Sequence, residues 1–204
     1  MKYKNLLAVA LVLATSPAFA SIDFSVDFEN TWDFSNGDIN DYYNGGIAAD
    51  GTSGTNLGVS FVNVSGLSND ELGPYYSNSP SLVGIAYPHD TAYINVASGV
   101  ANNLSFWYSS ASDVVGAVTV WSGLNGTGTE LGSFDLSANG TFNNWTHSTI
   151  SFAGTAQSFN LTNAAANYVA IDNVSSVPVP AAVWLFGTGL AMFGAVRRRG
   201  KASV

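Results

Sequence analysis

The chain contains no cysteine among its 204 residues. Disulfide bonds, thiolate metal sites and thiol catalysis are therefore excluded, whatever the redox state of the compartment. Lysine and arginine are missing from residues 21–180, because the six basic residues lie in the first four and the last eight positions. All fourteen Asp and Glu residues lie inside that stretch, so it carries a formal charge of −14 with histidine neutral.

This charge distribution excludes nucleic-acid binding, which depends on Lys and Arg to neutralise phosphates. Ion pairs with Lys or Arg are impossible within 21–180 for the same reason. The carboxylates there must be hydrated, bonded to amides and hydroxyls, or bound to cations. The length suits one domain with targeting segments.

Residues 1–20 have the three parts of a secretory signal peptide. Two lysines precede an apolar run over 6–14, and Ala18 and Ala20 then form an A-x-A cleavage site. The apolar run is too short to span a bilayer. We therefore expect an exported protein whose mature chain begins at Ser21.

Residues 177–204 are predicted to anchor the chain in a membrane. An apolar stretch at 181–196 precedes three arginines, which place the C-terminus in the cytoplasm by the positive-inside rule. The alternative, a buried C-terminal helix, is disfavoured because a soluble domain gains nothing from a fully apolar segment beside three arginines. The residues that define this segment are Val177, Pro178, Val179, Pro180, Arg197, Arg198 and Arg199.

This segment resembles the PEP-CTERM sorting segment of Gram-negative bacteria that make extracellular polysaccharide. That segment has a proline signature, an apolar helix and a basic tail; VPVPAAVWLFG is similar to its VPxPA variant, with Val179 replacing the usual acidic residue. The resemblance implies processing by an exosortase, a membrane-embedded cysteine protease, from an inner-membrane-anchored intermediate. The expected destination is the cell surface or extracellular matrix.

Residues 21–176 show short apolar–polar alternation with a period of two, separated by turns rich in glycine. This pattern favours an all-β fold, a β-sandwich of the jelly-roll type. The Asn125-Gly126 pair suits a turn with positive φ. Strands are predicted at 59–64, 81–87, 92–97, 104–109, 114–121, 130–136, 145–152, 157–161 and 168–174.

Three motifs of this domain resemble those of secreted jelly-roll modules related to carbohydrate-binding domains: Asp27-Phe28-Glu29, Tyr42-Tyr43-Asn44-Gly45-Gly46 and Ile171-Asp172-Asn173-Val174. In such modules the first and last strands run side by side, and a structural calcium often joins a Glu of one to an Asp of the other. The resemblance therefore implies calcium at Glu29 and Asp172. The alternative is that Glu29 is a solvated strand end and Asp172 caps a turn.

Two further groups of polar residues resemble metal-binding or catalytic sets only in part. Asp38, Asn40 and Asp41 offer oxygen ligands but lack the glycine and distal Glu of an EF-hand loop. His89 in a proline turn and His147 on a polar strand face fit surface imidazoles better than members of a Ser/His/Asp triad.

Exposed aromatic rings would mark a sugar platform, and Tyr75 and Tyr76, expected in a loop, are the predicted ligand contacts. We expect a non-catalytic extracellular or cell-surface matrix protein that binds glycan. The alternative is a secreted polysaccharide hydrolase with an Asp/Glu pair. The other aromatic candidates are Trp32, Tyr42, Tyr43, Trp107, Trp121 and Trp145.

Overall fold

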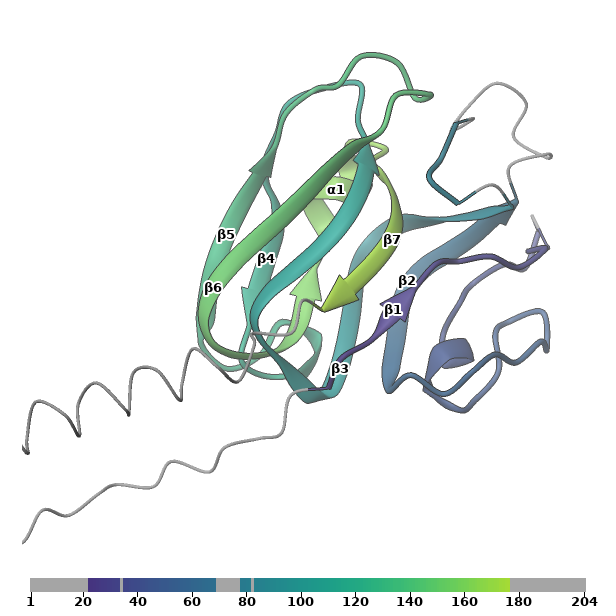
Figure 1. The fold of residues 1–204 in the computed structure, drawn as a ribbon, viewed down its shortest axis with the longest axis horizontal. Helices are drawn as coiled ribbons and strands as arrows, with labels where there is room; N and C mark the ends of the chain where they lie inside the picture. Colours follow the sequence, from purple (N-terminus) through teal and green to yellow (C-terminus); the bar gives the residue numbers. More distant parts are fainter. Residues whose placement is uncertain (1–21, 34, 69–77, 82, 177–204) are drawn as a thin grey trace, which may run out of the picture.

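The structure, a computed structural model, describes residues 22–33, 35–68, 78–81 and 83–176 (Figure 1). The predicted signal peptide and the predicted sorting segment both lie outside these ranges. Within them, no helix has the length and apolar character needed to cross a membrane. The predicted membrane helix at 181–196 stays a prediction.

The described chain is mostly β, and its strands pair antiparallel in one seven-stranded sheet with the order β1-β7-β3-β6-β4-β5, where β2 pairs with β3. The all-β expectation is confirmed. The strands are β1 (Ser25–Val26), β2 (Val59–Ser68), β3 (Gly84–Ser109), β4 (Val114–Trp121), β5 (Glu130–Leu136), β6 (Thr146–Asn160) and β7 (Ala170–Ser176). The short helices are η1 (Tyr42–Asn44), η2 (Leu124–Gly126) and α1 (Thr162–Ala166).

Strand β3 bends so strongly that its beginning and its end pair with opposite edges of β7. Ala86, near its start, and Tyr108, near its end, both pair with Ile171 of β7. A strand residue with two partners has one on each side, so the sheet folds back over itself and encloses a core (Figure 1). Strand β1 extends β7 through the pairs Ser25 with Ser175 and Val26 with Val174. The predicted side-by-side arrangement of the first and last strands is therefore confirmed.

The predicted separation of 81–87, 92–97 and 104–109 into three strands is wrong, because 84–87, 92–97 and 104–109 all belong to β3. Its pairing register with β6 shifts at two places, one of them between Ala101 and Asn103, where Asn102 has a φ of 70°. Gly99 has a φ of 84°. Residues that favour positive φ thus mark bulges here, where the strand bends without ending. The predicted strands 145–152 and 157–161 merge into β6 in the same way.

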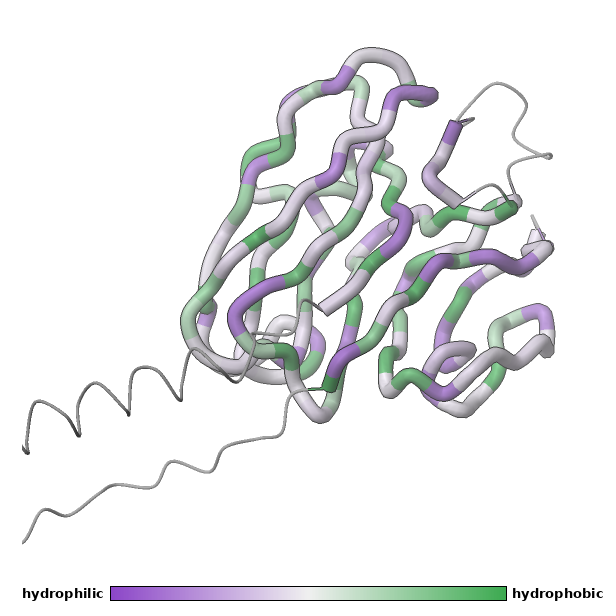
Figure 2. The backbone as a smooth tube through the Cα atoms, viewed as in Figure 1, coloured by the Kyte–Doolittle hydropathy of each residue, from purple (hydrophilic) through white to green (hydrophobic). Residues whose placement is uncertain are grey.

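The core follows from the alternation along the strands, which Figure 2 shows as alternating green and pale segments. Leu104, Phe106 and Tyr108 lie on one face of β3 and are all buried, as their spacing predicts. Trp32 is also buried, and its indole Nε1 donates to the carbonyl of Phe28 at 2.9 Å. The large rings therefore come from strands and from the loop after β1.

The resemblance placed an opening strand at Asp27-Phe28-Glu29, and this is wrong, since β1 ends at Val26. Phe28 has a φ of 58° and is fully buried. The left-handed backbone turns the chain out of the sheet while the ring packs edge-on against Phe61, 5.7 Å between centroids. Glu29 consequently follows a turn.

Candidate functional site

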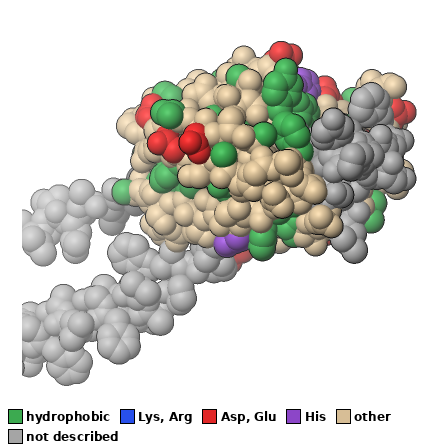
Figure 3. Space-filling model, turned by 90° about the horizontal axis from the view of Figure 1, so that it is seen from above, with side chains coloured by type: hydrophobic (Ala, Val, Ile, Leu, Met, Phe, Trp, Pro, Cys, Tyr) green, Lys and Arg blue, Asp and Glu red, His purple; other side chains and the backbone are tan. Residues whose placement is uncertain are grey.

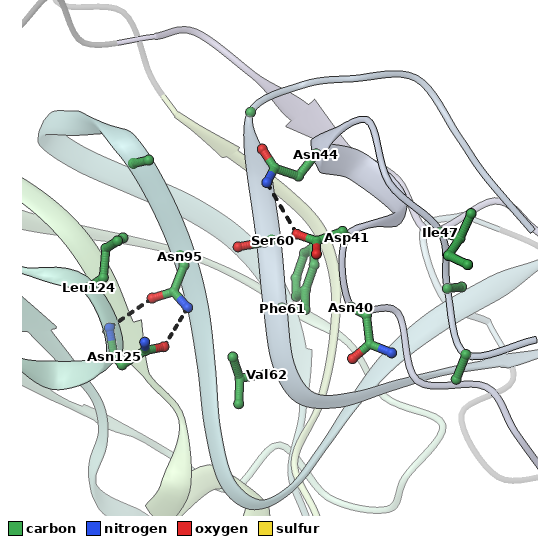
Figure 4. A pocket seen from close by; sticks show the side chains of 14 residues that line it. Asn40, Asp41, Asn44, Ile47, Ser60, Phe61, Val62, Asn95, Leu124 and Asn125 are labelled. Carbon is green, nitrogen blue, oxygen red and sulfur yellow. Dashed lines mark hydrogen bonds between the residues drawn. The ribbon is translucent and has the colours of Figure 1, made fainter. Parts of the chain in front are cut away.

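A hollow of about 800 Å³ lies beside β2, within the size range of ligand-binding pockets (Figure 4). The segment 38–49 forms one wall, and β3 together with η2 forms the other. Ser60 and Val62 of β2 lie between them. The polar side chains among the lining residues are Asn40, Asp41, Asn44, Ser60, Asn95 and Asn125, and the larger apolar ones are Ile47, Val62 and Leu124.

The first wall is held on β2 by backbone hydrogen bonds. The amide of Ile39 donates to the carbonyl of Val64 at 2.9 Å, and the amide of Phe61 donates to the carbonyl of Asn40 at 2.8 Å. Asn40 adopts a φ of 46°, a left-handed conformation that asparagine accepts more readily than most residues. The wall turns back at Gly45, whose φ is 78°. These contacts place the Asn40 and Asp41 side chains along the hollow.

The second wall depends on an amide pair between β3 and η2. The Nδ2 of Asn95 donates to the Oδ1 of Asn125 at 2.7 Å, and the backbone amide of Asn125 donates to the Oδ1 of Asn95 at 2.9 Å. Ser158 of β6 adds a third anchor, since its hydroxyl accepts from the amide of Gly126 at 2.9 Å. Asn125 has a φ of 53° and Gly126 of 70°, so the predicted positive-φ turn is confirmed.

The hollow offers neutral hydrogen-bonding groups beside exposed apolar surface. Ile47 is 60% exposed and Leu124 is 39% exposed. Amide and hydroxyl groups both donate and accept hydrogen bonds, and among the residues that line the hollow the single carboxylate is Asp41. The sequence pattern indicates Asn40 and Asp41 only as weak metal ligands, and it gives no signal for Ser60 and Asn95.

The two predicted calcium ligands flank one short segment of chain. Asp172 is fully buried in β7, and its two carboxylate oxygens accept from the amides of Ser81, at 2.9 Å, and Asn173, at 2.7 Å. Glu29 is exposed, and its Oε1 accepts from the amides of Val83, at 2.8 Å, and Gly84, at 3.1 Å. The structure thus brings both side chains to the segment that precedes and begins β3.

Burial raises the pKa of Asp172 to about 7, against the opposing effect of the hydrogen bonds from Ser81 and Asn173. The negative charges of Glu29 and Asp27 raise the pKa further. The candidate ligand atoms are carboxylate oxygens, as calcium requires. No Lys or Arg in residues 21–180 compensates their negative charge when they are ionised. No group of three or more His, Cys, Asp or Glu gathers closely enough in the described ranges to hold a metal, so main-chain carbonyls or water would have to complete the ligand set.

Neither histidine forms a catalytic triad in the described part of the chain. His89 lies within β3 and not in the predicted turn, because Pro88 continues the pairing with Val64. The Oδ1 of Asp38 lies 2.9 Å from the Nε2 of His89 and accepts from the hydroxyl of Ser65 at 2.7 Å. Serine and histidine therefore both bind the carboxylate, and the hydroxyl is not directed at the imidazole.

His147 lies on β6, as predicted, exposed to solvent and edge-on to Trp107, with 5.3 Å between ring centroids. Most of the aromatic candidates for a sugar platform belong to the core or its border. Trp32 and Tyr43 are buried, and Tyr42 packs on Trp32 at 5.0 Å between centroids. The predicted contacts Tyr75 and Tyr76 lie outside the described residues.

No family model matches the sequence, and no curated protein matches it. Solved structures resemble it at low scores. CBM35 from Paenibacillus barcinonensis shares 14% identity at a TM-score of 0.40, covering 60% of this chain and 94% of its own. A mutant of the family 29 carbohydrate-binding module CBM29-2 shares 12% identity at 0.39, covering 62% and 86%.

An Arthrobacter globiformis T6 isomalto-dextranase in complex with panose shares 11% identity at a TM-score of 0.38, covering 76% of this chain and 32% of its own. All three scores lie below 0.5, so these likenesses carry no conclusion about ligand or activity. The candidate site rests on the geometry of the hollow.

Proposed function

We propose that the described domain is a non-catalytic binding domain that takes a glycan in the hollow beside β2. The observation that carries this proposal is the lining itself. Asn40, Ser60 and Asn125 offer neutral donors and acceptors suited to sugar hydroxyls, and Ile47 and Leu124 offer apolar surface suited to the C–H faces of a sugar ring.

The hydrolase alternative has weaker support. Glycoside hydrolysis by the usual route needs two carboxyl groups on either side of the scissile bond. Of the residues that line the hollow, Asp41 alone supplies one. Binding without cleavage is therefore the function that this geometry favours.

Titration calorimetry of the purified full chain with neutral oligosaccharides tests the proposed binding. Product analysis of the same mixtures tests for cleavage. Ile47→Ala removes apolar surface from the hollow and is expected to weaken binding about fivefold, roughly 1 kcal/mol. Val115→Ala is the matched control, because Val115 is 79% exposed on β4 and does not line the hollow. Glycan release, or equal effects of the two substitutions, would refute the proposal.

The wider role also belongs to the proposal. An exported matrix or surface protein, sorted by an exosortase-type protease through the inner membrane and associated with extracellular polysaccharide, is supported by the signal-like residues 1–20 and the sorting-like residues 177–204. A jelly-roll topology is supported by the folded-over antiparallel sheet. Structural calcium at Glu29 and Asp172 is supported by their shared position and their mutual repulsion.

A further inference from the structure

The segment 38–49, which forms the first wall, and the residue after it contain three carboxylates, Asp38, Asp41 and Asp50, of which Asp41 lines the hollow. The stretch 21–180 contains neither Lys nor Arg to offset their charge. Among the described residues, the face drawn in Figure 3 shows red acidic groups and no blue basic ones. A ligand in the hollow therefore enters a negative potential.

Of the three carboxylates, Asp41 is the one that lines the hollow with acceptor capacity to spare. Its Oδ1 accepts from the Nδ2 of Asn44 at 3.1 Å, and its second oxygen accepts no hydrogen bond from the described residues (Figure 4). Asp38 is engaged by Ser65 and His89. Asp41 thus leaves an anionic oxygen at the hollow beside neutral amides.

An ammonium group fits this arrangement better than a hydroxyl or an anion. It carries three donors and a positive charge, so it forms a charge-assisted hydrogen bond to Asp41 and directs its other N–H groups at neighbouring amide oxygens. A carboxylate, sulfate or phosphate would meet like charge without any cationic partner. One contact between two like charges in water weakens binding about fivefold, measured as Kd.

We infer that the hollow selects glycans whose sugar units carry free amines, such as glucosamine polymers, over neutral and anionic glycans. This inference rests on the proposed glycan-binding function. The preferred glycan is thus one with amine-bearing sugar units, and Asp41 is the residue that determines this specificity.

The test compares four hexasaccharides on the purified full chain by titration calorimetry: β-1,4-linked glucosamine, its fully N-acetylated form, cellohexaose and a uronic acid hexamer. The glucosamine hexamer should bind about tenfold more tightly than the two neutral ones, and the uronic acid hexamer should bind most weakly. The preference should shrink in 1 M salt, because screening acts on the charged contact.

Two substitutions that each remove one carboxylate separate a specific contact from general attraction to an acidic protein. Asp41→Asn should abolish the amine preference, so that the glucosamine hexamer and the neutral hexamers bind about equally. Asp113→Asn should keep it, since Asp113 precedes β4 at the end opposite η2 and asparagine retains an oxygen for its bond from the amide of Ala138. Circular dichroism verifies that both variants fold.

Each result decides the matter. A preference that Asp41→Asn removes and Asp113→Asn preserves supports the inference. Equal binding of amine-bearing and neutral hexamers overturns it and leaves the proposed glycan function intact. Equal losses in the two variants show general electrostatic attraction and also overturn it. Binding of none of the four sugars overturns both the inference and the proposed function.

Discussion

Asn95 and Asn125 exchange two hydrogen bonds, one between their side chains and one from the backbone amide of Asn125 to the Asn95 side chain, and so join β3 to η2. Asn95 is buried between Ser60 of β2 and Ser158 of β6, its pairing partners on either side. Asn95 therefore links the sheet directly to the wall that carries Leu124, and Ser158 adds a second link.

Asn95→Ala is expected to destabilise the domain by about 1–3 kcal/mol, because it leaves the amide of Asn125 without its partner. Chemical denaturation measures the loss, and hydrogen exchange at 124–126 shows whether the wall loosens. Asn163→Ala is the control, since Asn163 is exposed and its amide makes bonds of 3.3 and 3.2 Å to the carbonyls of Val115 and Gly116. Equal losses in both variants would contradict a special role for the Asn95 pair.

Gly66→Ala should destabilise the core through crowding. A Cβ at this position would lie 2.1 Å from the Cδ2 of the buried Trp32 ring, and overpacking of this kind costs about 1–3 kcal/mol or more. Gly51→Ala separates packing from backbone strain, since no atom lies within 4 Å of its Cβ but its φ is 85°. The control should lose only about 1 kcal/mol. Denaturation of both variants checks the order, and a larger loss at Gly51 would show that the Trp32 contact relaxes easily.

The apolar–polar pattern of the sequence predicted the exact bounds of two strands. The predictions 114–121 and 130–136 coincide with β4 and β5, whose flanking segments are rich in turn-forming residues. It failed at β3, because Gly99 and Asn102 favour positive φ, and such residues occur both in turns that end strands and in bulges that bend them. Only the pairing with β2, β6 and β7 distinguishes the two outcomes.

Sequence patterns could not predict the hollow, because it too depends on pairing between distant segments. Ser60 and Asn95 are polar residues within strands, and such residues usually indicate a solvated face. Their role depends on the register that pairs them and on the docking of 38–49 against β2, which the backbone bonds of Ile39 and Phe61 hold in place. The Asn125-Gly126 turn is the part of the site whose backbone conformation the sequence predicted.

Processing at both ends is a prediction of the sequence alone. Intact-mass measurement of protein from cells that export it should show a chain that begins at Ser21 and has lost Arg197 to Arg199. A species that still begins at Met1 would refute the signal peptide. Glutamate in place of Arg197, Arg198 and Arg199 should change orientation or retention, and unchanged localisation would refute the role of the basic tail.

Stability should fall as pH rises through the range in which Asp172 ionises. Burial raises its pKa in the folded protein to about 7 from an ordinary value of 3.8, so the folded state binds the proton more tightly. The contribution to stability is full below about pH 4 and is lost as pH rises toward 7. The slope is at most about 1.4 kcal/mol per pH unit.

Denaturation between pH 5 and 7 measures this slope with less interference from ordinary carboxylates, which titrate near pH 4. Asp172→Asn is the comparison, because asparagine does not ionise in this range. Its stability should change less with pH than that of the wild type. Parallel curves for the two proteins would mean that Asp172 is already ionised throughout.

Calcium should stabilise the domain if Glu29 and Asp172 hold it, because a divalent cation relieves the repulsion between their carboxylates and favours ionised Asp172. At free calcium a hundredfold above its Kd, the gain is about 2.7 kcal/mol. Melting curves with calcium and with chelator measure it for the wild type, Glu29→Gln and Asp172→Asn. Glu130→Gln, which removes an exposed carboxylate on β5, is the control and should keep the wild-type shift. A wild-type midpoint that ignores calcium would exclude the site, whereas a shift retained by both site variants would place the ion elsewhere.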